Sequence, residues 1–247
     1  MIKISVVLAV FNEEENLRDC LQSIKDLAWE IVIVDGGSTD KTLEIAKDFN
    51  ARIIQTNNPP LFHINKNKAI DAASGDWILQ LDADEIVSPK LSEEIKKVVS
   101  KKSDIVGYWI PRRNFFLGKY LSKGGQYPDY TLRLYRRGKG RLSGKDVHEQ
   151  AQVSGKVGYL KNDLLHLRDK SFAIYMERFN RYTDLLAKQI KNPGIDYLFI
   201  KPIFWFIKAY IRHRGYVDGF PGFVFALFSS LRFPVAYFKF WTEERNK

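Results

Sequence analysis

The segment Ile2-Lys-Ile-Ser-Val-Val-Leu-Ala-Val10 opens the chain, and Trp77-Ile-Leu-Gln-Leu-Asp-Ala-Asp84 ends its first third. The first segment is a continuous apolar run rich in β-branched residues, which is typical of a strand buried on both faces of a sheet. Two more short apolar runs, residues 30–34 and 51–55, lie between these segments. Strands that alternate with helical segments predict βαβ units and a mostly parallel sheet.

The connecting segments predict helices at residues 12–27, 41–49 and 66–73. Asn12 is expected to cap the first of them, because its side-chain oxygen can accept a hydrogen bond from an amide of the first turn. Ser74-Gly75 stops the third helix directly before the strand at 77–81. The first 84 residues therefore predict an α/β domain.

Acidic turns follow two of the predicted strands. Asp35 begins the turn Asp35-Gly-Gly-Ser-Thr-Asp40, and Asp82-Ala-Asp84 ends the strand at 77–81. In parallel sheets of this kind ligands bind beyond the carboxyl ends of the strands. Both turns are therefore expected at one ligand site.

Carboxylates spaced as Asp-x-Asp suit a hard divalent cation such as Mg²⁺ or Mn²⁺. Transfer of a sugar from a nucleoside diphosphate needs such a cation, because the leaving diphosphate must be neutralised. We expect Asp84 to bind the metal and Asp82 to reach the ribose, or the metal through water. A solvated turn with no ligand is the simpler alternative.

Three further residues are candidates for the donor site. A carboxylate at Asp35 can accept the imide N–H of uracil, although the same turn can also serve as the cap of the next helix. Lys66 and Asn67 open the helix before the metal-binding turn, where Lys66 can contact a diphosphate or can lie in solvent.

Lys and Arg outnumber Asp and Glu by 39 to 29, which gives a formal net charge of +10. A basic chain of this kind indicates an anionic partner. A nucleic acid is not expected, because the sequence has no basic helix or RNP-like strand. A dinucleotide-binding dehydrogenase is disfavoured, because no G-x-G-x-x-G follows the first strand. The single cysteine, Cys20, and the lack of an export signal favour the cytoplasm.

The segment from residue 198 to 241 is apolar and aromatic, but Lys201, Lys208, Arg212 and Arg232 interrupt it. A membrane span needs about 20 mostly apolar residues, and these runs are shorter. Interfacial helices that lie on a membrane fit the pattern better. A core face or a dimer face is the alternative.

Four stretches in order resemble the signatures of family 2 glycosyltransferases. They are Ser5-Val-Val-Leu-Ala-Val-Phe-Asn-Glu-Glu14, Val34-Asp-Gly-Gly-Ser-Thr-Asp40, Lys66-Asn-Lys-Ala-Ile with Ala73-Ser-Gly75, and Leu81-Asp-Ala-Asp-Glu85. The resemblance implies a GT-A fold, an inverting mechanism and a donor site formed by the matching positions, which are Val10, Asn12, Glu13, Asp35, Lys66, Asn67, Asp82 and Asp84. Many members have two acidic residues where this chain has Asp35-Gly36, so the nucleoside is open between uridine, which we favour, guanosine and deoxythymidine.

Inversion in a single displacement needs one base to remove the proton of the acceptor hydroxyl. Two carboxylates downstream of the metal-binding turn are candidates: Asp129 in Tyr127-Pro-Asp-Tyr130, and Glu149 in Val147-His-Glu149. A strand-edge turn and a surface ion pair are their structural alternatives. His148 and His166 are weaker candidates for a late metal ligand.

The later segments resemble a narrower group, the lipopolysaccharide-core glucosyltransferases and related bacterial envelope enzymes. They include Pro111-Arg-Arg-Asn-Phe-Phe-Leu-Gly-Lys119 and Gly215-Tyr-Val-Asp-Gly-Phe-Pro-Gly-Phe223. This resemblance implies an anionic, lipid-linked glycan acceptor at the inner face of the cytoplasmic membrane. The predicted domains are a glycosyltransferase domain at 1–170, with a donor half at 1–90 and an acceptor half at 91–170, and a helical extension at 171–247. A scaffold of the same fold that has lost catalysis is the remaining alternative.

Overall fold

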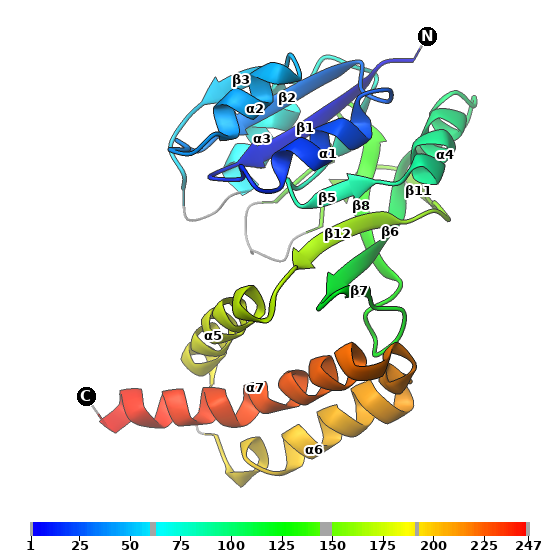
Figure 1. Ribbon diagram of the computed structural model, residues 1–247. Helices are drawn as coiled ribbons and strands as arrows, with labels where there is room; N and C mark the ends of the chain where they lie inside the picture. Colours follow the sequence, from blue (N-terminus) through cyan, green and yellow to red (C-terminus); the bar gives the residue numbers. More distant parts are fainter. Residues whose placement is uncertain (1, 60–62, 144–149, 191–192, 246–247) are drawn as a thin grey trace. The chain divides into compact units, whose positions relative to one another are not determined.

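The computed structural model describes residues 2–59, 63–143, 150–190 and 193–245 (Figure 1). The chain divides into two compact units. The first comprises Met1–Arg112 and Tyr130–His166, and the second comprises Arg113–Asp129 and Leu167–Lys247. The predicted boundary at residue 170 between functional domains stays a prediction.

The first unit is built on parallel strands. They are β1 (Ile4–Val10), β2 (Glu30–Asp35), β3 (Arg52–Gln55) and β4 (Trp77–Gln80), hydrogen-bonded in the order β3-β2-β1-β4. Each lies within two residues of its predicted range, because buried parallel strands read as continuous apolar runs. The register pairs Val10 with Asp35, so the carboxyl ends of β1 and β2 are level.

Beyond β4 the sheet becomes mixed. Its order continues as β8 (Asp129–Arg136), β6 (Ile105–Phe116), β12 (Leu164–Asp169) and β5 (Glu85–Val87). Strand β8 runs antiparallel to β4, and β12 runs antiparallel to β5. The remaining strands are β7 (Lys119–Tyr120) and β11 (Lys156–Tyr159), which pair with β6, and the separate pair β9 (Gly140–Arg141) and β10 (Gln152–Val153).

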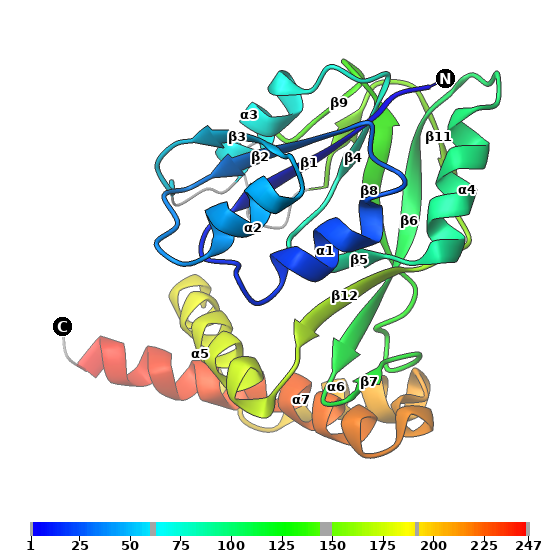
Figure 2. The same ribbon diagram turned by 45° about the horizontal axis from the view of Figure 1, so that its top comes forward.

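Helices cover both faces of the parallel strands (Figure 2). The helices α1 (Leu17–Ile24), α2 (Thr42–Asp48) and α4 (Pro89–Val99) bury their apolar residues in one core with β1. Helix α3 (His63–Ala72) packs on the opposite face, where Ala69 and Ile70 meet Val7 and Val34. Burial on both faces fixes the strands whose ends carry the acidic turns.

The predicted cap of the first helix is wrong. Helix α1 begins at Leu17, and Asn16 precedes it. Asn12 instead adopts a left-handed backbone with φ 53°, and its side-chain oxygen accepts a hydrogen bond from the amide of Thr39 at 2.8 Å. A short asparagine side chain tolerates this backbone region better than most residues, so Asn12 joins two loops and does not begin a helix.

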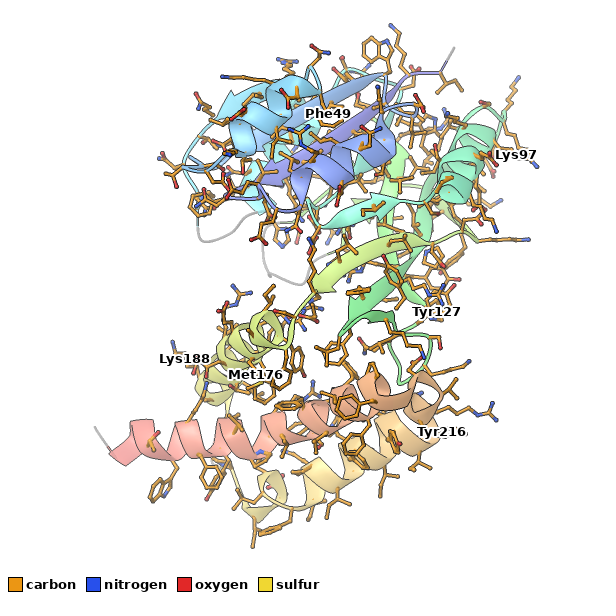
Figure 3. The ribbon with its side chains drawn as sticks, in the orientation of Figure 1. Phe49, Lys97, Tyr127, Met176, Lys188 and Tyr216 are labelled. Carbon is orange, nitrogen blue, oxygen red and sulfur yellow. The ribbon has the colours of Figure 1, made fainter. Side chains whose placement is uncertain are left out.

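The second unit is mainly helical. Its elements are α5 (Phe172–Gln189), α6 (Ile200–Phe206), α7 (Gly219–Arg245) and the short turns η1 (Ile195–Tyr197), η2 (Ile207–Arg212) and η3 (Gly215–Asp218). Aromatic and aliphatic side chains fill the space between these helices (Figure 3), and Met176 points from α5 toward α7. Edge-to-face ring pairs such as Phe179–Phe228, 5.5 Å apart, hold α5 against α7.

Helix α7 is continuous over 27 residues and includes Arg232, the residue at which its apolar run is interrupted. Arg232 is accommodated because its guanidinium lies over the rings of Trp205 and Phe233, at 4.6 and 4.8 Å. By length and composition the stretch Gly215–Thr242 is able to cross a membrane, with a mean hydropathy of 1.3. A core helix of a soluble protein passes the same test, so this finding alone does not establish a span.

Candidate functional site

The predicted donor residues all belong to the first unit. Asp35 ends β2, and Asp82 and Asp84 follow β4 after one intervening residue. Strand β1 lies between β2 and β4 in the sheet. The two acidic turns are therefore at the carboxyl edge of the sheet, as the sequence predicted.

Asp82 lies between two cations. Its Oδ1 forms an ion pair with Nζ of Lys66, and its Oδ2 forms another with the guanidinium of Arg133 from β8. The Lys66 and Arg133 side chains are only 7% and 10% exposed, whereas that of Asp82 is 29% exposed. Burial raises the pKa of Asp82, but the charges of Arg133 and Lys66 outweigh it and hold this pKa well below its ordinary value.

Glu85 completes this charged network. Its fully buried carboxylate accepts a hydrogen bond from Arg133 at 2.8 Å and faces Arg112 at 3.4 Å. The other oxygen of Glu85 accepts a bond from the amide of Asp82 at 3.0 Å. Burial lowers the pKa of Arg133, but the charges of Asp82 and Glu85 hold it above its ordinary value. Glu85 therefore fixes both the arginine and the turn.

Asp84 has a different partner, the imidazole of His166. Its Oδ2 lies 3.2 Å from Nε2 of His166. The antiparallel pairing of β12 with β5 places His166 opposite Glu85, one residue from Asp84. Burial raises the pKa of Asp84, but the hydrogen bond and the charge of His166 outweigh it, so the pKa lies below its ordinary value. The structure thus joins two residues that are 82 positions apart in the sequence.

Glu13 adds negative charge to the same place. Burial and the charges of Asp84 and Asp82 raise the pKa of Glu13, whereas a hydrogen bond from Asn16 at 3.0 Å opposes the rise. A carboxyl whose pKa is raised by other carboxylates indicates a site that favours a cation. Among the described residues, no three carboxylate, imidazole or thiol groups are close enough together to enclose a metal ion.

The loops after β1 and β2 are held together by side chains. The amide of Asn12 donates to Oγ of Ser38 at 2.9 Å, and the amide of Glu13 donates to Oγ1 of Thr42 at 2.7 Å. Asp35 is fully buried and accepts hydrogen bonds from the amides of Gly37 and Ser38. These bonds hold Asp35 in its own turn. The alternative role of the turn, a cap on the next helix through Ser38 or Thr39, is not observed, because α2 follows Lys41, which forms no side-chain cap bond. Contact of Asp35 with uracil stays a prediction.

Gly36, where many family members have an acidic residue, lies close to Asn58. A Cβ built on Gly36 lies 3.1 Å from Cβ of Asn58, which is closer than most Cβ atoms approach a neighbour. An acidic side chain at position 36 therefore requires Asn58 to move. Asn58 is exposed beside the turn, and its amide is able both to donate and to accept hydrogen bonds.

Asn67 binds the backbone of another element. Its Nδ2 donates to the carbonyl of Leu142 at 2.9 Å, and its Oδ1 accepts from the amide of Leu142 at 3.1 Å. This pair of bonds ties α3 to the segment after β9.

The structure describes only one of the two candidate bases, Asp129. Asp129 begins β8 in the second unit, where its Oδ2 accepts a hydrogen bond from Nδ2 of Asn114 at 3.3 Å. Glu149 and His148 lie outside the described residues.

Sequence reasoning did not single out Glu85, and it did not pair Arg133 with Asp82. Their signal is an ionisable residue inside an apolar strand: Arg133 stands between Leu132 and Leu134, and all three side chains are buried. Buried arginine and glutamate are rarely found without a charged partner. This pattern predicts a partner but does not identify it, because the partner comes from another strand.

Residues 5–152 match the family model "Glycosyl transferase family 2". The chain belongs to this family. Among curated relatives, the lipopolysaccharide core biosynthesis glycosyltransferase LpsC of Rhizobium meliloti is 30% identical over 240 residues, which cover 92% of this chain and 87% of LpsC. This family 2 glycosyltransferase therefore shares nearly its whole length with LpsC.

The solved structure of TarS has a fold similar to that of this chain. The structure of TarS from S. aureus aligns with a TM-score of 0.51 and 18% identity over 94% of this chain and 49% of its own. Glucosyl-3-phosphoglycerate synthase from Mycobacterium tuberculosis, solved with Mn²⁺, UDP and glucosyl-3-phosphoglycerate, aligns with a TM-score of 0.38 and 26% identity over 47% of this chain and 45% of its own. The chain thus spans about half the length of each of these structures.

Proposed function

We propose that this glycosyltransferase inverts the anomeric centre as it transfers a sugar, favouring UDP-hexose as donor, in a metal-dependent reaction. The acceptor we propose is a lipid-linked or envelope glycan such as the lipopolysaccharide core. The observation that carries the proposal is the pairing of Asp84 with His166 beside Asp82, which Lys66 and Arg133 hold. This arrangement combines a cation site with two cationic side chains at one sheet edge.

Asp84 and His166 are the residues that would hold Mg²⁺ or Mn²⁺. A carboxylate oxygen and an imidazole nitrogen both suit Mn²⁺, and the diphosphate of the donor supplies further oxygen ligands in sites of this type. The bound cation would neutralise charge on the leaving diphosphate. The carboxylate of Glu13 adds negative charge near Asp84, and it acts through its charge.

Lys66 and Arg133 are proposed to bind the diphosphate. Both are already oriented by Asp82 and are mostly buried, so their charges are only weakly screened by water. Asp82 then acts mainly by holding these cations in place. The sequence predicted instead that Asp82 contacts the ribose, or the metal through water. A contact with the ribose would use the exposed part of its side chain.

The loops that contain Val10, Asn12 and Asp35 are proposed to enclose the nucleoside. Asp35 holds the turn through Gly37 and Ser38, and Asn12 ties this turn to the end of β1. Asn58 beside Gly36 is able to hydrogen-bond a base edge. Asn67 is proposed to act indirectly, through the backbone of Leu142.

Asp129 is proposed as the base that removes the acceptor proton, with Glu149 as the alternative. Asp129 carries a carboxylate, which is the kind of group that can remove the proton, and Asn114 donates a hydrogen bond to it. The acceptor class is supported by the similarity to LpsC, which is a lipopolysaccharide core glycosyltransferase by name. The alternatives are transfer to a protein or to polyprenyl phosphate, and a scaffold of the same fold that has lost catalysis.

Attachment to the inner face of the cytoplasmic membrane is proposed through one face of α6 and η2. Exposed apolar residues recur there every three or four positions, and we call them the α6 face: Phe199, Ile200, Ile203, Phe204, Ile207 and Ile211. Each is at least half exposed. Lys208 and the exposed Arg212 lie on the same segment, which favours an anionic lipid surface over a neutral protein partner.

A donor screen tests the proposal. Binding of UDP-, GDP- and dTDP-sugars is measured by calorimetry with Mn²⁺, with Mg²⁺ and with a chelator. We expect a UDP-hexose to bind best, and only with a metal present. Equal binding with the chelator would overturn the metal assignment, and binding of none of the donors would favour the scaffold.

A further inference from the structure

A small cavity lies within the second unit, between the end of β6, α5 and α7. Its lining combines apolar side chains of β6, of Leu121 and of α7 with five polar ones, namely Asn114, Gln126, Arg168, Asp169 and Arg178. Its volume of about 20 Å³ is enough for a single water-sized group. All five side chains belong to the second unit, so the cavity does not depend on how the two units are placed.

Arg178 of α5 is the central group of this cavity. One of its terminal nitrogens forms an ion pair with Asp169, and its guanidinium lies over the ring of Tyr175 at 5.5 Å. Its other terminal nitrogen is buried and has no hydrogen-bond partner among the described residues. A buried donor left without a partner is unfavourable, so this nitrogen favours an acceptor from a ligand.

The charge around Arg178 is positive. Burial and the charge of Arg168 lower the pKa of Arg178, and only Asp169 among the cavity residues opposes them. Two guanidinium groups therefore face one carboxylate in a partly buried place. An oxyanion would both balance the charge and accept the hydrogen bond.

Asn114 links the cavity to the proposed base. It lines the cavity, and its side-chain amide donates to Asp129. We propose that the cavity binds one oxygen of an anionic group on the acceptor, a phosphate or a carboxylate, with Arg178 and Arg168 as its cationic partners. This inference rests on the proposed function, because the acceptor is what the nearby base would deprotonate.

The test measures oxyanion binding apart from transfer. Inorganic phosphate, and acetate in a parallel series, are titrated by calorimetry into the full chain without metal or donor. The variants are Arg168→Gln and Arg178→Lys. The second keeps a positive charge beside Asp169 but replaces the three guanidinium nitrogens with one. Arg181→Gln is the matched control, because Arg181 is exposed on the same helix.

We expect one of the two anions to bind to the wild-type chain. Its affinity should fall at least tenfold in Arg168→Gln and in Arg178→Lys, and it should be unchanged in Arg181→Gln. Stronger binding of phosphate would identify a phosphorylated acceptor, and stronger binding of acetate an acidic sugar. Equal binding by all variants, or no binding of either anion, would overturn the proposal. Titration of UDP with Mn²⁺ into the same variants separates the oxyanion proposal from the proposed function. If an oxyanion binds but UDP does not, the proposed function is refuted and the oxyanion site is not.

In a transfer assay, Arg168→Gln is expected to raise the KM for the acceptor about tenfold while the KM for the donor stays unchanged. A loss confined to kcat, or equal changes in both KM values, would contradict a role in acceptor binding.

Discussion

Asp82 and Asp84 are separated by one residue, yet they have opposite surroundings. Asp82 is held by two cations from α3 and β8, whereas Asp84 faces one imidazole. The triplet therefore divides into a residue that orients cations and a residue that is available to a metal. This division leads to different predictions for the two carboxylates.

Replacing Asp84 with Asn is expected to lower kcat at least 100-fold while the protein stays folded, because the variant loses a charged metal ligand. His166→Gln is expected to weaken Mn²⁺ binding in the same assay. The measurements are kcat as a function of Mn²⁺ and the unfolding temperature. Asp104→Asn, which alters an exposed ion pair with Lys156, is the control. Wild-type turnover in Asp84→Asn would show that Asp84 is no metal ligand.

Replacing Asp82 with Asn is expected to destabilise the fold at pH 7 by about 3 kcal/mol, because Lys66 and Arg133 lose their partner. The pKa of Asp82 is lowered in the folded state, so its stabilisation is complete well above the unfolded pKa of about 3.9 and declines as the pH falls below it. The difference in unfolding free energy between wild type and variant should therefore shrink between pH 5 and pH 3. Urea unfolding at several pH values measures it, and a constant difference would exclude the ion-pair explanation.

Asp129→Asn is expected to reduce kcat by at least 100-fold and to leave the affinity for donor unchanged, because an amide is not a base. Asn114→Ala serves as the comparison, since it removes the partner of Asp129 without removing the carboxylate. Single-turnover assays and donor titration distinguish these effects. If Asp129→Asn keeps its activity and Glu149→Gln loses it, the base is Glu149.

At the scale of elements, the α6 face differs from α7. Ala226 and Ala236 of α7 are buried, and Nζ of Lys239 is neutralised by Asp184 at 2.6 Å. Helix α7 thus packs within its unit, and deleting it would expose the apolar side of α5. Point substitutions on α6 are therefore a better test of membrane binding than a truncation.

The double variant Ile203→Glu, Ile207→Glu is expected to bind anionic vesicles at least tenfold more weakly, because two half-exposed apolar side chains become acidic. Sedimentation with phosphatidylglycerol vesicles measures the affinity. Trp29→Glu is the matched control, since Trp29 is an equally exposed apolar residue of the first unit. Unchanged binding by the double variant would exclude the α6 face as the attachment site.

At the scale of the whole molecule, the net charge of +10 adds an electrostatic attraction to anionic lipid. We expect binding to phosphatidylglycerol vesicles to weaken as salt rises from about 0.05 M to 0.5 M, because the ions screen exposed charges. Some binding of the wild-type protein should remain at high salt, and this remaining binding should be lost in the α6 double variant. If the wild-type protein loses all vesicle binding at high salt, its attachment depends on charge alone.

Much of the first unit could be predicted from the sequence. The strands ending at Val10 and Asp35 and the turn at Asp82 follow from local apolar runs and from the acidic residues after them. The hydrogen bond that joins Asn12 to Thr39 could not be predicted, because the two residues are 27 positions apart in the chain. The position of Arg232 over Trp205 could not be predicted for the same kind of reason, since the two residues are far apart in the chain.

The sequence by itself determined the class of fold, the order of the acidic turns and the family, because these depend on residues near one another in the chain. Only the tertiary structure decided which charges meet. It brought His166 to Asp84, Arg133 to Asp82 and Arg178 to the cavity beside Asn114. Local sequence carries no record of such pairings, because each depends on strands and helices that become neighbours only when the sheet and the helical unit are assembled.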